Sequence, residues 1–289
     1  MAVSLPTVRT VRALRARVKA WRDDSETIAL VPTMGALHQG HLSLVDIAHK
    51  KADRTIVTIF VNPEQFAPNE DFSSYPRDEK RDKVALSERG TDLVFSPNLV
   101  EIYPPDFSTR VSVGGLSEVL CGASRPHFFG GVATVVTKLL LQALPDIAIF
   151  GEKDYQQQLI IRRLVRDLNI PVKIVTGPII READGLAMSS RNAYLSPEDR
   201  AVATRLYQTL RDISAKLASG KTTGQVLPRA KRQLKAAGFE IDYLEVMDPN
   251  NLTPIKGRIT GKVRLFAAAT LGATRLIDNL AVPQRRRAR

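Results

Sequence analysis

The most regular feature of the chain is an alternation of short apolar runs with segments of helical periodicity over the first 180 residues. The apolar runs cover residues 27–31, 55–61, 92–97, 146–151 and 172–177. Because polar residues do not alternate within them, they are typical of strands buried on both faces. Helical patterns lie between the runs, one from about His41 and others over 77–89, 132–144 and 155–168. This order predicts an α/β fold with a Rossmann-like, doubly wound parallel sheet, whose ligands bind beyond the carboxyl ends of the strands.

The pattern changes after residue 180. Ser196 is a suitable N-cap, Pro197 suits a first helical position, and Gly220 suits a helix end, so one helix is expected between them. A second helix and two strands are expected at 226–237, 241–248 and 263–272. Because no further βα alternation follows, we expect a smaller α+β domain with a boundary near residues 178–188. The predicted domains are 1–180, which contains the parallel sheet, and 181–289, the smaller C-terminal domain.

Composition narrows the class of protein. No run of residues approaches the roughly 18 apolar residues of a membrane-spanning helix, and the arginines near the amino terminus are interleaved with apolar positions, unlike a signal peptide. The single cysteine, Cys121, excludes an internal disulfide and fits a reducing compartment. We therefore expect a cytoplasmic protein that does not contact a membrane.

The formal charge of +12 raises the question of a nucleic-acid partner. Four of the arginines lie in the terminal segment 284–289, which we expect to be disordered, and many other basic residues alternate with acids on helical faces. This distribution favours a small polyanionic substrate, and nucleic acid is not expected as a partner. An RNA-binding or tRNA-acting protein remains the alternative from another class, and tRNA binding that survives physiological salt would support it.

The segment "PTMGALHQGH" (32–41) joins the end of the first long strand to a helix start, and it contains two of the four histidines. Unpaired backbone amides and the helix dipole favour an anion there. Gly35 and Gly40 allow close approach of a ligand, and His38 and His41 lie near enough in sequence to reach neighbouring phosphates. The alternative is a structural loop in which one histidine caps the helix and the other packs on the sheet.

His38-Gln39-Gly40-His41 resembles the HIGH signature of the nucleotidylyltransferase and class I aminoacyl-tRNA synthetase superfamily. That resemblance implies a later, basic KMSKS-like loop on the phosphates, and residues 188–191 read "MSSR". Arg191 would neutralise charge as the bond to the leaving diphosphate breaks. Taken alone, Ser-Ser-Arg is a common loop sequence. A nucleotidylyltransferase that moves AMP onto a phosphate would share this site but would release no AMP.

The segment "FGEKDYQQQ" (150–158) lies between these two motifs and begins where a strand ends. Lys153 is expected over the carboxyl edge of the sheet, facing the same anion. Asp154 is expected to cap the helix that starts at Tyr155 and to meet a ribose hydroxyl. The alternatives are a simple N-cap for Asp154 and a solvated surface position for Lys153.

Together these strings resemble the pantothenate synthetase (pantoate–β-alanine ligase) family. The matching strings are "PTMGALHQGH", "VNPEQF", "YPR", "FGEKDYQQ", "READGLAMSSRN" and "RLIDN", which span most of the chain. The resemblance implies ATP-dependent condensation of (R)-pantoate with β-alanine through an enzyme-bound pantoyl adenylate. It further implies Mg²⁺, release of AMP and diphosphate, and a cytoplasmic homodimer.

The resemblance also implies site residues. Those with catalytic roles would be His38, His41, Lys153 and Arg191. The ATP site would be lined by Pro32, Thr33, Met34, Gly35, His38, Gly40, His41, Gly151, Lys153, Asp154, Ile180, Met188, Ser189, Ser190 and Arg191. Pantoate would be bound by Met34, Asn62, Gln65 and Gln157, and β-alanine by Gln65. Asp82 is the expected metal contact, because Mg²⁺ is often held mainly by phosphates and one carboxylate.

The chain departs from the family pattern in "RPHFFGGV" (125–132), where the family has Arg-Pro-Gly-His-Phe. Phe128 takes the place of the family histidine, which helps to bind pantoate, and His127 takes that of its glycine. Either the loop shifts so that His127 reaches the site, or Phe128 replaces a polar contact and weakens pantoate binding. We favour the shifted loop, although the backbone angles of a glycine need not suit histidine.

Overall fold

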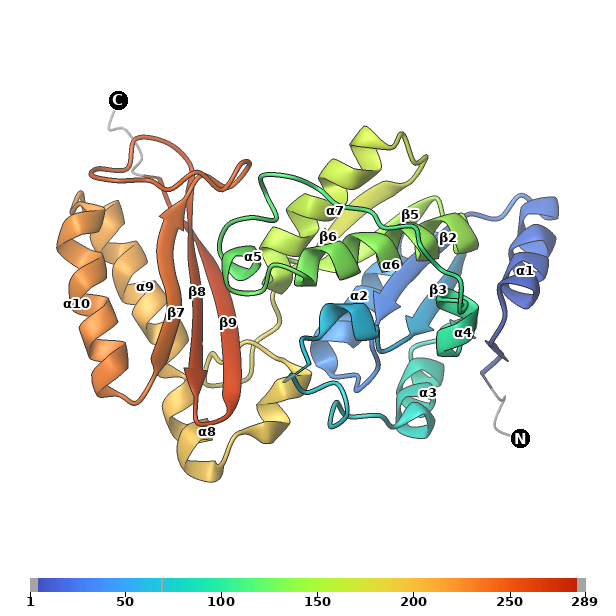
Figure 1. The fold of residues 1–289 in the computed structure, drawn as a ribbon, viewed down its shortest axis with the longest axis horizontal. Helices are drawn as coiled ribbons and strands as arrows, with labels where there is room; N and C mark the ends of the chain where they lie inside the picture. Colours follow the sequence, from blue (N-terminus) through green and yellow to red (C-terminus); the bar gives the residue numbers. More distant parts are fainter. Residues whose placement is uncertain (1–4, 69, 285–289) are drawn as a thin grey trace. The chain divides into compact units, whose positions relative to one another are not determined.

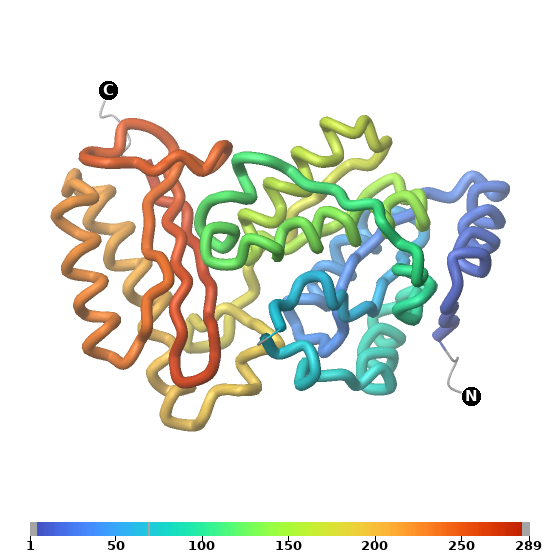
Figure 2. The backbone as a smooth tube through the Cα atoms, in the orientation of Figure 1, coloured from blue at the N-terminus to red at the C-terminus, as the bar shows by residue number. Residues whose placement is uncertain are grey.

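The computed structural model describes residues 5–68 and 70–284, which divide into two compact units. The N-terminal unit contains the chain up to Glu152 together with Gln157–Pro178, and the C-terminal unit contains Lys153–Gln156 and the chain from Ile179. The sequence placed residues 153–156 in the first domain. Figure 2 traces the path of the chain through both units. No helix in the described part of the chain has the length and apolar character needed to cross a membrane.

The described residues of the N-terminal unit form a six-stranded parallel sheet in the order β1-β4-β3-β2-β5-β6. Strands β2, β3, β5 and β6 are labelled in Figure 1. The strands are β1 (Thr7–Val8), β2 (Ile28–Thr33), β3 (Arg54–Ile59), β4 (Leu93–Phe95), β5 (Ile147–Gly151) and β6 (Lys173–Gly177). The strand order reverses between β2 and β5, which confirms the doubly wound topology. Ligands of such sheets bind at this reversal, beyond the strand ends.

The helices of this unit cover both faces of the sheet. They are α1 (Val11–Asp23), α2 (Gln39–His49), α3 (Glu79–Glu88), α4 (Leu99–Ile102), α5 (Cys121–Ser124), α6 (Phe128–Ala143) and α7 (Tyr155–Asp167), with 3-10 turns η1 (Pro63–Gln65) and η2 (Glu152–Asp154). Right-handed crossovers place α2 and α3 on one face and α1, α6 and α7 on the other. Accordingly α2 packs on β2, β3 and β5, and α1 packs on α6. Helix α6 begins four residues before the predicted start, and α1, α4 and α5 were not predicted.

The strands are buried on both faces, as the absence of alternation in their sequences predicted. Leu30, Ile56 and Ile149 have no exposed surface. Ala29 and Val31 belong to the apolar cluster that includes the α2 side chains Val45 and Ala48. This apolar packing holds α2 against β2.

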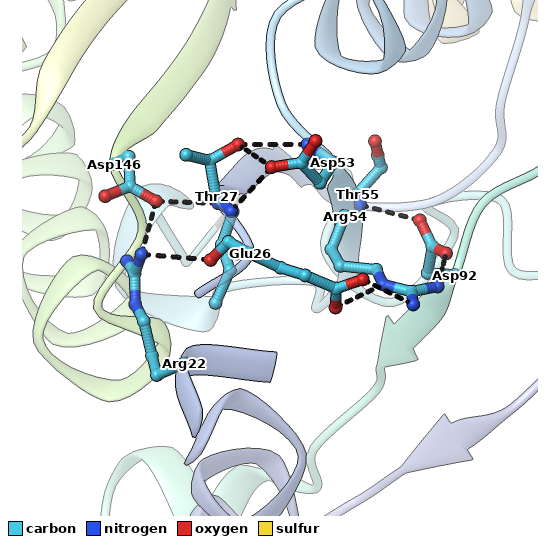
Figure 3. Close-up of polar contacts among 9 residues, drawn as sticks. Arg22, Glu26, Thr27, Asp53, Arg54, Thr55, Asp92 and Asp146 are labelled. Carbon is cyan, nitrogen blue, oxygen red and sulfur yellow. Dashed lines mark hydrogen bonds and ion pairs between the residues drawn. The ribbon is translucent and has the colours of Figure 1, made fainter. Parts of the chain in front are cut away.

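The amino ends of the strands are fastened by charged side chains, as Figure 3 shows. Three aspartates each accept a backbone amide there: Asp53 from Thr27, Asp92 from Thr55 and Asp146 from Ile28. Arg54 pairs with Glu26 at 2.7 Å and with Asp92 at 3.0 Å. Hydrogen bonds from the side chain and the backbone of Thr27 lower the pKa of Asp53. The polar network at this end serves stability and leaves the opposite end of the sheet for a ligand.

The described residues of the C-terminal unit form a three-stranded antiparallel sheet in the order β7-β8-β9 with helices on one face. The elements are η3 (Ser190–Tyr194), α8 (Pro197–Ala203), α9 (Arg205–Ala218), α10 (Thr223–Ala236), β7 (Glu240–Met247), β8 (Val263–Leu271) and β9 (Thr274–Val282). Leu210, Leu234 and Leu265 lie in the core between helices and sheet. This is the smaller α+β architecture that the sequence predicted.

Three details of this unit differ from the prediction. The single helix expected from Ser196 to Gly220 is two helices that meet at Thr204, although Ser196 does cap the first of them by accepting the Asp199 amide. Helix α10 begins at Thr223 because a capping box forms on the residue before it. Strand β9, which contains the "RLIDN" string, was not predicted. The predicted disordered tail, apart from Gln284, lies outside the described residues.

Candidate active site

The loop that leaves the carboxyl end of β2 turns sharply at Gly35. Gly35 and Ala36 have φ angles of +81° and +51°. A Cβ atom on Gly35 would lie 3.0 Å from Oδ2 of Asp82 and 3.1 Å from Cγ2 of Ile59. Thr33 closes the turn by accepting the Gly35 amide at 3.2 Å and donating to the Thr58 carbonyl at 2.6 Å. Glycine is thus required here by its backbone angle and by the closeness of a carboxylate.

Asp82, the predicted metal contact, holds this loop from α3. Its Oδ2 accepts the Ala36 amide at 2.9 Å and its Oδ1 accepts the Leu37 amide at 2.8 Å. The residue is 2 % exposed. Burial raises the pKa of Asp82, although the two backbone hydrogen bonds act in the opposite direction. Both oxygens are therefore engaged in fixing the loop, and the role of Asp82 as a magnesium contact stays a prediction.

His38 and His41 lie together at the start of α2. His38 is the N-cap residue, and its Nδ1 accepts the Gly40 amide at 3.0 Å. The two imidazole rings are 4.1 Å apart between centroids and inclined by 35°. An Nδ1 that accepts a hydrogen bond assigns the proton of the neutral ring to Nε2. The cap foreseen in the structural alternative is therefore present, and it gives His38 an Nε2 donor of the kind that suits an anion.

The predicted pantoate residues Asn62 and Gln65 form a buried amide pair beside η1. They are 1 % and 8 % exposed. Tyr103 donates to Oδ1 of Asn62 at 2.9 Å, and Nδ2 of Asn62 donates to Oε1 of Gln65 at 3.0 Å and to the Gly131 carbonyl at 3.1 Å. Burial, with a smaller effect from Glu64, raises the pKa of Tyr103, so its hydroxyl remains a donor. This relay orients Gln65 so that its other end, the Nε2 donor, is available for a carboxylate or hydroxyl.

Arg125 supports the same region through hydrogen bonds, although the sequence analysis gave it no role in the site. Its guanidinium donates to both oxygens of Glu70 and, at 2.9 Å, to the backbone carbonyl of Gln65. Burial alone would raise the pKa of Glu70, but the hydrogen bond and the charge of Arg125 outweigh it and lower that pKa. Its guanidinium carbon also lies 4.0 Å from the ring centroid of Phe128. Arg125 therefore links Gln65 to the start of α6.

The departure from the family pattern falls at that helix start. Phe128 is the first residue of α6 and is half-buried under Arg125, whereas His127 is the N-cap residue and is exposed. Because His127 is exposed at this helix start, the choice between a shifted loop and a lost polar contact stays a prediction. Phe128 instead contributes a ring to the packing of Arg125 where the family supplies an imidazole.

Two other predicted residues of the N-terminal unit lie near the end of β5. Gly151 is the last residue of that strand and pairs with Gly177 of β6. Gln157 is half-buried in the first turn of α7, directly after the four residues that belong to the C-terminal unit.

Lys153 and Asp154 belong to those four residues. The ammonium of Lys153 lies 3.1 Å from Oδ1 of Asp154, and their side chains are 19 % and 44 % exposed. The carbonyl of Lys153 accepts Nδ2 of Asn279 at 2.9 Å. Lys153 is therefore anchored through its backbone to the sheet of the C-terminal unit, and it is more buried than a solvated surface lysine.

The predicted nucleotide residues from Ile180 to Arg191 form one hairpin and the turn that follows it. The Met188 amide donates to the Ile180 carbonyl at 3.0 Å, and the Glu182 amide donates to the Leu186 carbonyl at 2.8 Å. Ser189 caps η3, with its Oγ accepting the Arg191 amide at 3.3 Å. Ile180, Met188 and Arg191 are thus brought together, with Ser189 and Ser190 between them.

Known proteins resemble the chain over nearly its whole length. The sequence profile of the Pantoate-beta-alanine ligase family matches residues 6–281. The pantothenate synthetase of Paramagnetospirillum magneticum is 55 % identical over 98 % of this chain and 99 % of its own length, and that of Rhodospirillum rubrum is 51 % identical over 96 % and 99 %.

Solved structures agree. Pantothenate synthetase from Thermus thermophilus has a TM-score of 0.90 at 46 % identity, covering 96 % of this chain and 99 % of the other. Pantoate-beta-alanine ligase from Francisella tularensis, complexed with Beta-gamma ATP and Beta-alanine, has a TM-score of 0.82 at 33 % identity, covering 96 % and 97 %. These matches span both units and confirm the resemblance drawn from the motifs: the chain belongs to the pantoate-beta-alanine ligase family.

Proposed function

We propose that the protein condenses (R)-pantoate with β-alanine to give pantothenate, with ATP converted to AMP and diphosphate. The observation that carries the proposal is a family match that runs through both units, together with full-length relatives that are pantothenate synthetases. The Francisella structure, with its nucleotide and β-alanine, supports ATP and β-alanine as ligands of this fold.

In the first step of the proposed reaction, a carboxylate oxygen of pantoate attacks the α-phosphorus of ATP. A bond forms between that oxygen and phosphorus, the bond to the β-phosphate oxygen breaks, and diphosphate leaves with the electron pair. Such a step requires alignment and dispersal of negative charge rather than a nucleophilic protein group. The Nε2 donor of His38, with His41, Lys153 and Arg191, would meet the phosphate oxygens.

The remaining ATP contacts would come from the loop Pro32–Gly35, from Gly40, from Gly151 and Asp154, and from the hairpin residues Ile180 and Met188–Ser190. The loop is supported by Asp82, and the hairpin by its own backbone hydrogen bonds. Rigid support suits the role, because backbone donors that are already in place need no reorganisation when the phosphate charge changes.

Pantoate would be held by Met34, Asn62, Gln65 and Gln157. The support for Gln65 is its orientation, since its Oε1 accepts from Asn62 and its Nε2 is left to donate to a substrate oxygen. In the second step, the amine of β-alanine attacks the acyl carbon of the adenylate beside Gln65. An amide bond forms, the bond to the AMP oxygen breaks, AMP leaves with the electron pair, and the proton of the amine passes to solvent.

Magnesium enters the proposal as the counter-ion of ATP and would be held by the phosphates. Within the described residues no group of three or more His, Cys, Asp and Glu side chains is placed to hold a metal ion. Asp82 fits a metal poorly as a primary ligand, because both of its oxygens already accept backbone amides. We therefore assign no step to a residue-bound metal.

The test is pyrophosphate-to-ATP isotope exchange with pantoate present and β-alanine absent. Exchange that depends on pantoate is expected, because the adenylate forms reversibly before β-alanine binds. Exchange that ignores pantoate would refute the substrate assignment. Measuring AMP in the complete reaction separates the ligase from a nucleotidylyltransferase, which would accumulate an adenylated product instead.

A cytoplasmic location and a homodimeric state complete the proposal. They are supported by the family resemblance and by the single cysteine, which suits a reducing compartment. Light scattering on the purified protein would test the dimer, and cell fractionation would test the location.

A further inference from the structure

Two adjacent polar residues of β9 are buried but have no place in the reaction described so far. Asp278 and Asn279, from the "RLIDN" string, are 4 % and 2 % exposed. Successive strand residues point to opposite faces of a sheet. Asp278 pairs in register with Ala267, which belongs to the core beneath the helices, whereas Asn279 pairs with Phe266 on the other face. Buried polar groups are costly unless they are paired, so their partners indicate their purpose.

On the helix side, Asp278 pairs with Arg181. Arg181 lies at the base, or stem, of the hairpin 180–188, which would contact the nucleotide. The two guanidinium nitrogens of Arg181 donate to the two carboxylate oxygens at 2.7 and 2.9 Å. The guanidinium carbon also lies 3.6 Å from the ring centroid of Tyr207 in α9, and Arg181 donates to the Gly185 carbonyl at 3.0 Å. A bidentate pair of this kind fixes orientation as well as distance. The stem of the hairpin is therefore clamped to β9.

The clamp extends from the stem to Arg191. Asn192 donates to Oε1 of Glu182 at 3.0 Å and to the Ala187 carbonyl at 3.1 Å, which joins η3 to the hairpin. The 3-10 turn η3 also packs directly on β9. The backbone at Arg191 is thus fixed relative to Asp278.

On the other face, Asn279 binds the segment that carries Lys153. Its Nδ2 donates to the Lys153 carbonyl at 2.9 Å, and its Oδ1 accepts a hydrogen bond from Arg264. The guanidinium carbon of Arg264 in turn lies 4.1 Å from the ring centroid of Tyr155. Because Arg264 engages the oxygen, the amide has one orientation, with its donor toward Lys153.

We infer that Asp278 and Asn279 are positioning residues for the ATP half-reaction, through which one strand sets the spacing of Lys153 and Arg191. The inference rests on the proposed function. Strand β9 is bonded to β8 along its whole length, so it is a stiff reference for both segments. Two cations that approach one triphosphate from separate segments need such a common support, since a displacement of about 1 Å costs on the order of 100-fold in rate.

Two isosteric variants test the contact with Arg181 and the contact with the Lys153 carbonyl separately. Asn279→Asp keeps an oxygen for Arg264 and removes the donor to the Lys153 carbonyl. Asp278→Asn keeps the shape of the side chain and removes the charge that Arg181 requires. The matched control is Asp242→Asn, which breaks the ion pair between Asp242 of β7 and Arg275 of β9, a pair formed outside the two segments that carry Lys153 and Arg191.

The measurement is pantoate-dependent pyrophosphate–ATP exchange, beside the second half-reaction started from supplied pantoyl adenylate and β-alanine. We expect Asp278→Asn and Asn279→Asp each to lower the rate of exchange by about 10- to 100-fold and to raise the KM for ATP. The second half-reaction, which contains no β- or γ-phosphate, should change far less. Asp242→Asn should exchange at the wild-type rate.

Loss of stability must be separated from loss of positioning. Leu234→Ala, a core substitution in α10 of the same unit, supplies a destabilised comparator, and all rates are taken per folded molecule from thermal unfolding curves. The inference is overturned if Asp278→Asn and Asn279→Asp show the same exchange rate as Asp242→Asn. It is also overturned if these two variants slow both half-reactions equally and by the same factor as Leu234→Ala does. A wild-type protein without pantoate-dependent exchange would instead overturn the proposed function, and the inference with it.

Discussion

The substitution Asp82→Asn tests how the histidine loop is held at the end of β2. The carboxylate accepts the amides of Ala36 and Leu37 with separate oxygens, at 2.9 and 2.8 Å. An asparagine has one oxygen, so one of the two amides would face an NH₂ group in a site that is 2 % exposed. We expect the loop to shift away from that clash and to carry His38 and His41 with it.

The expected loss of stability follows from two effects that destabilise the variant and one that acts against them. A hydrogen bond to a charged group contributes about 1.5–3 kcal/mol, and a buried donor left unpaired costs about 1–3 kcal/mol. Against these, burial raises the folded-state pKa of Asp82 above its ordinary value of 3.8. The stability contributed by the protonated carboxyl is therefore fully present below pH 3.8 and is lost as the pH rises through the raised pKa. Asparagine avoids that loss, so the net destabilisation at neutral pH should be about 2 kcal/mol.

The assay is the pantoate-dependent exchange reaction together with denaturant unfolding. A displaced loop should lower exchange by about 10- to 100-fold per folded molecule, since the phosphate donors are no longer aligned. Asp78→Asn is the matched control, because Asp78 caps the same helix by accepting the Arg81 amide, and asparagine caps equally well. If Asp82→Asn and Asp78→Asn show the same exchange rate and the same KM for ATP, the loop does not depend on the carboxylate.

Three further substitutions test other parts of the structure. Gly35→Ala places a Cβ 3.0 Å from Oδ2 of Asp82 at a φ of +81°, and denaturant unfolding should show a loss of about 1–2 kcal/mol with a raised KM for ATP. Because Arg125 lowers the pKa of Glu70 despite burial, the stability from Glu70 is present above pH 4.5 and is lost as the pH falls through the lowered pKa. The difference in Tm between wild type and Glu70→Gln should therefore shrink on acidification, measured by thermal unfolding. Asp146→Ala removes an acceptor at the amino end of the sheet and should cost about 1 kcal/mol, with exchange per folded molecule unchanged.

Each of these expectations has an outcome that contradicts it. A Gly35→Ala protein as stable as wild type would mean that the loop has room for a side chain. A difference in Tm for Glu70→Gln that stays constant into acid would show that its pairing with Arg125 does not lower the pKa. Reduced exchange per folded molecule in Asp146→Ala would show that the two ends of the sheet are coupled.

The sequence-based prediction was correct for elements with a clear local sequence pattern and wrong for elements without one. The buried strands were found because uninterrupted apolar runs of this length suit a parallel sheet. The start of α8 was found from the local chemistry of Ser196 and Pro197. The interruption at Thr204 was missed, because that residue keeps helical angles of φ −60° and ψ −24° and has no breaker beside it. Strand β9 was missed, because its buried aspartate and asparagine interrupt the apolar pattern of a core strand.

The sequence by itself determined the sheet, the motifs and the family, since these depend on local periodicity and on residues close together in the chain. Only the tertiary structure decided what supports the motifs. Asp82 lies 45 residues beyond Leu37, and Asn279 lies 126 residues beyond Lys153. No local pattern records such contacts, because they form only when separate elements pack and leave each buried polar group a single partner within reach.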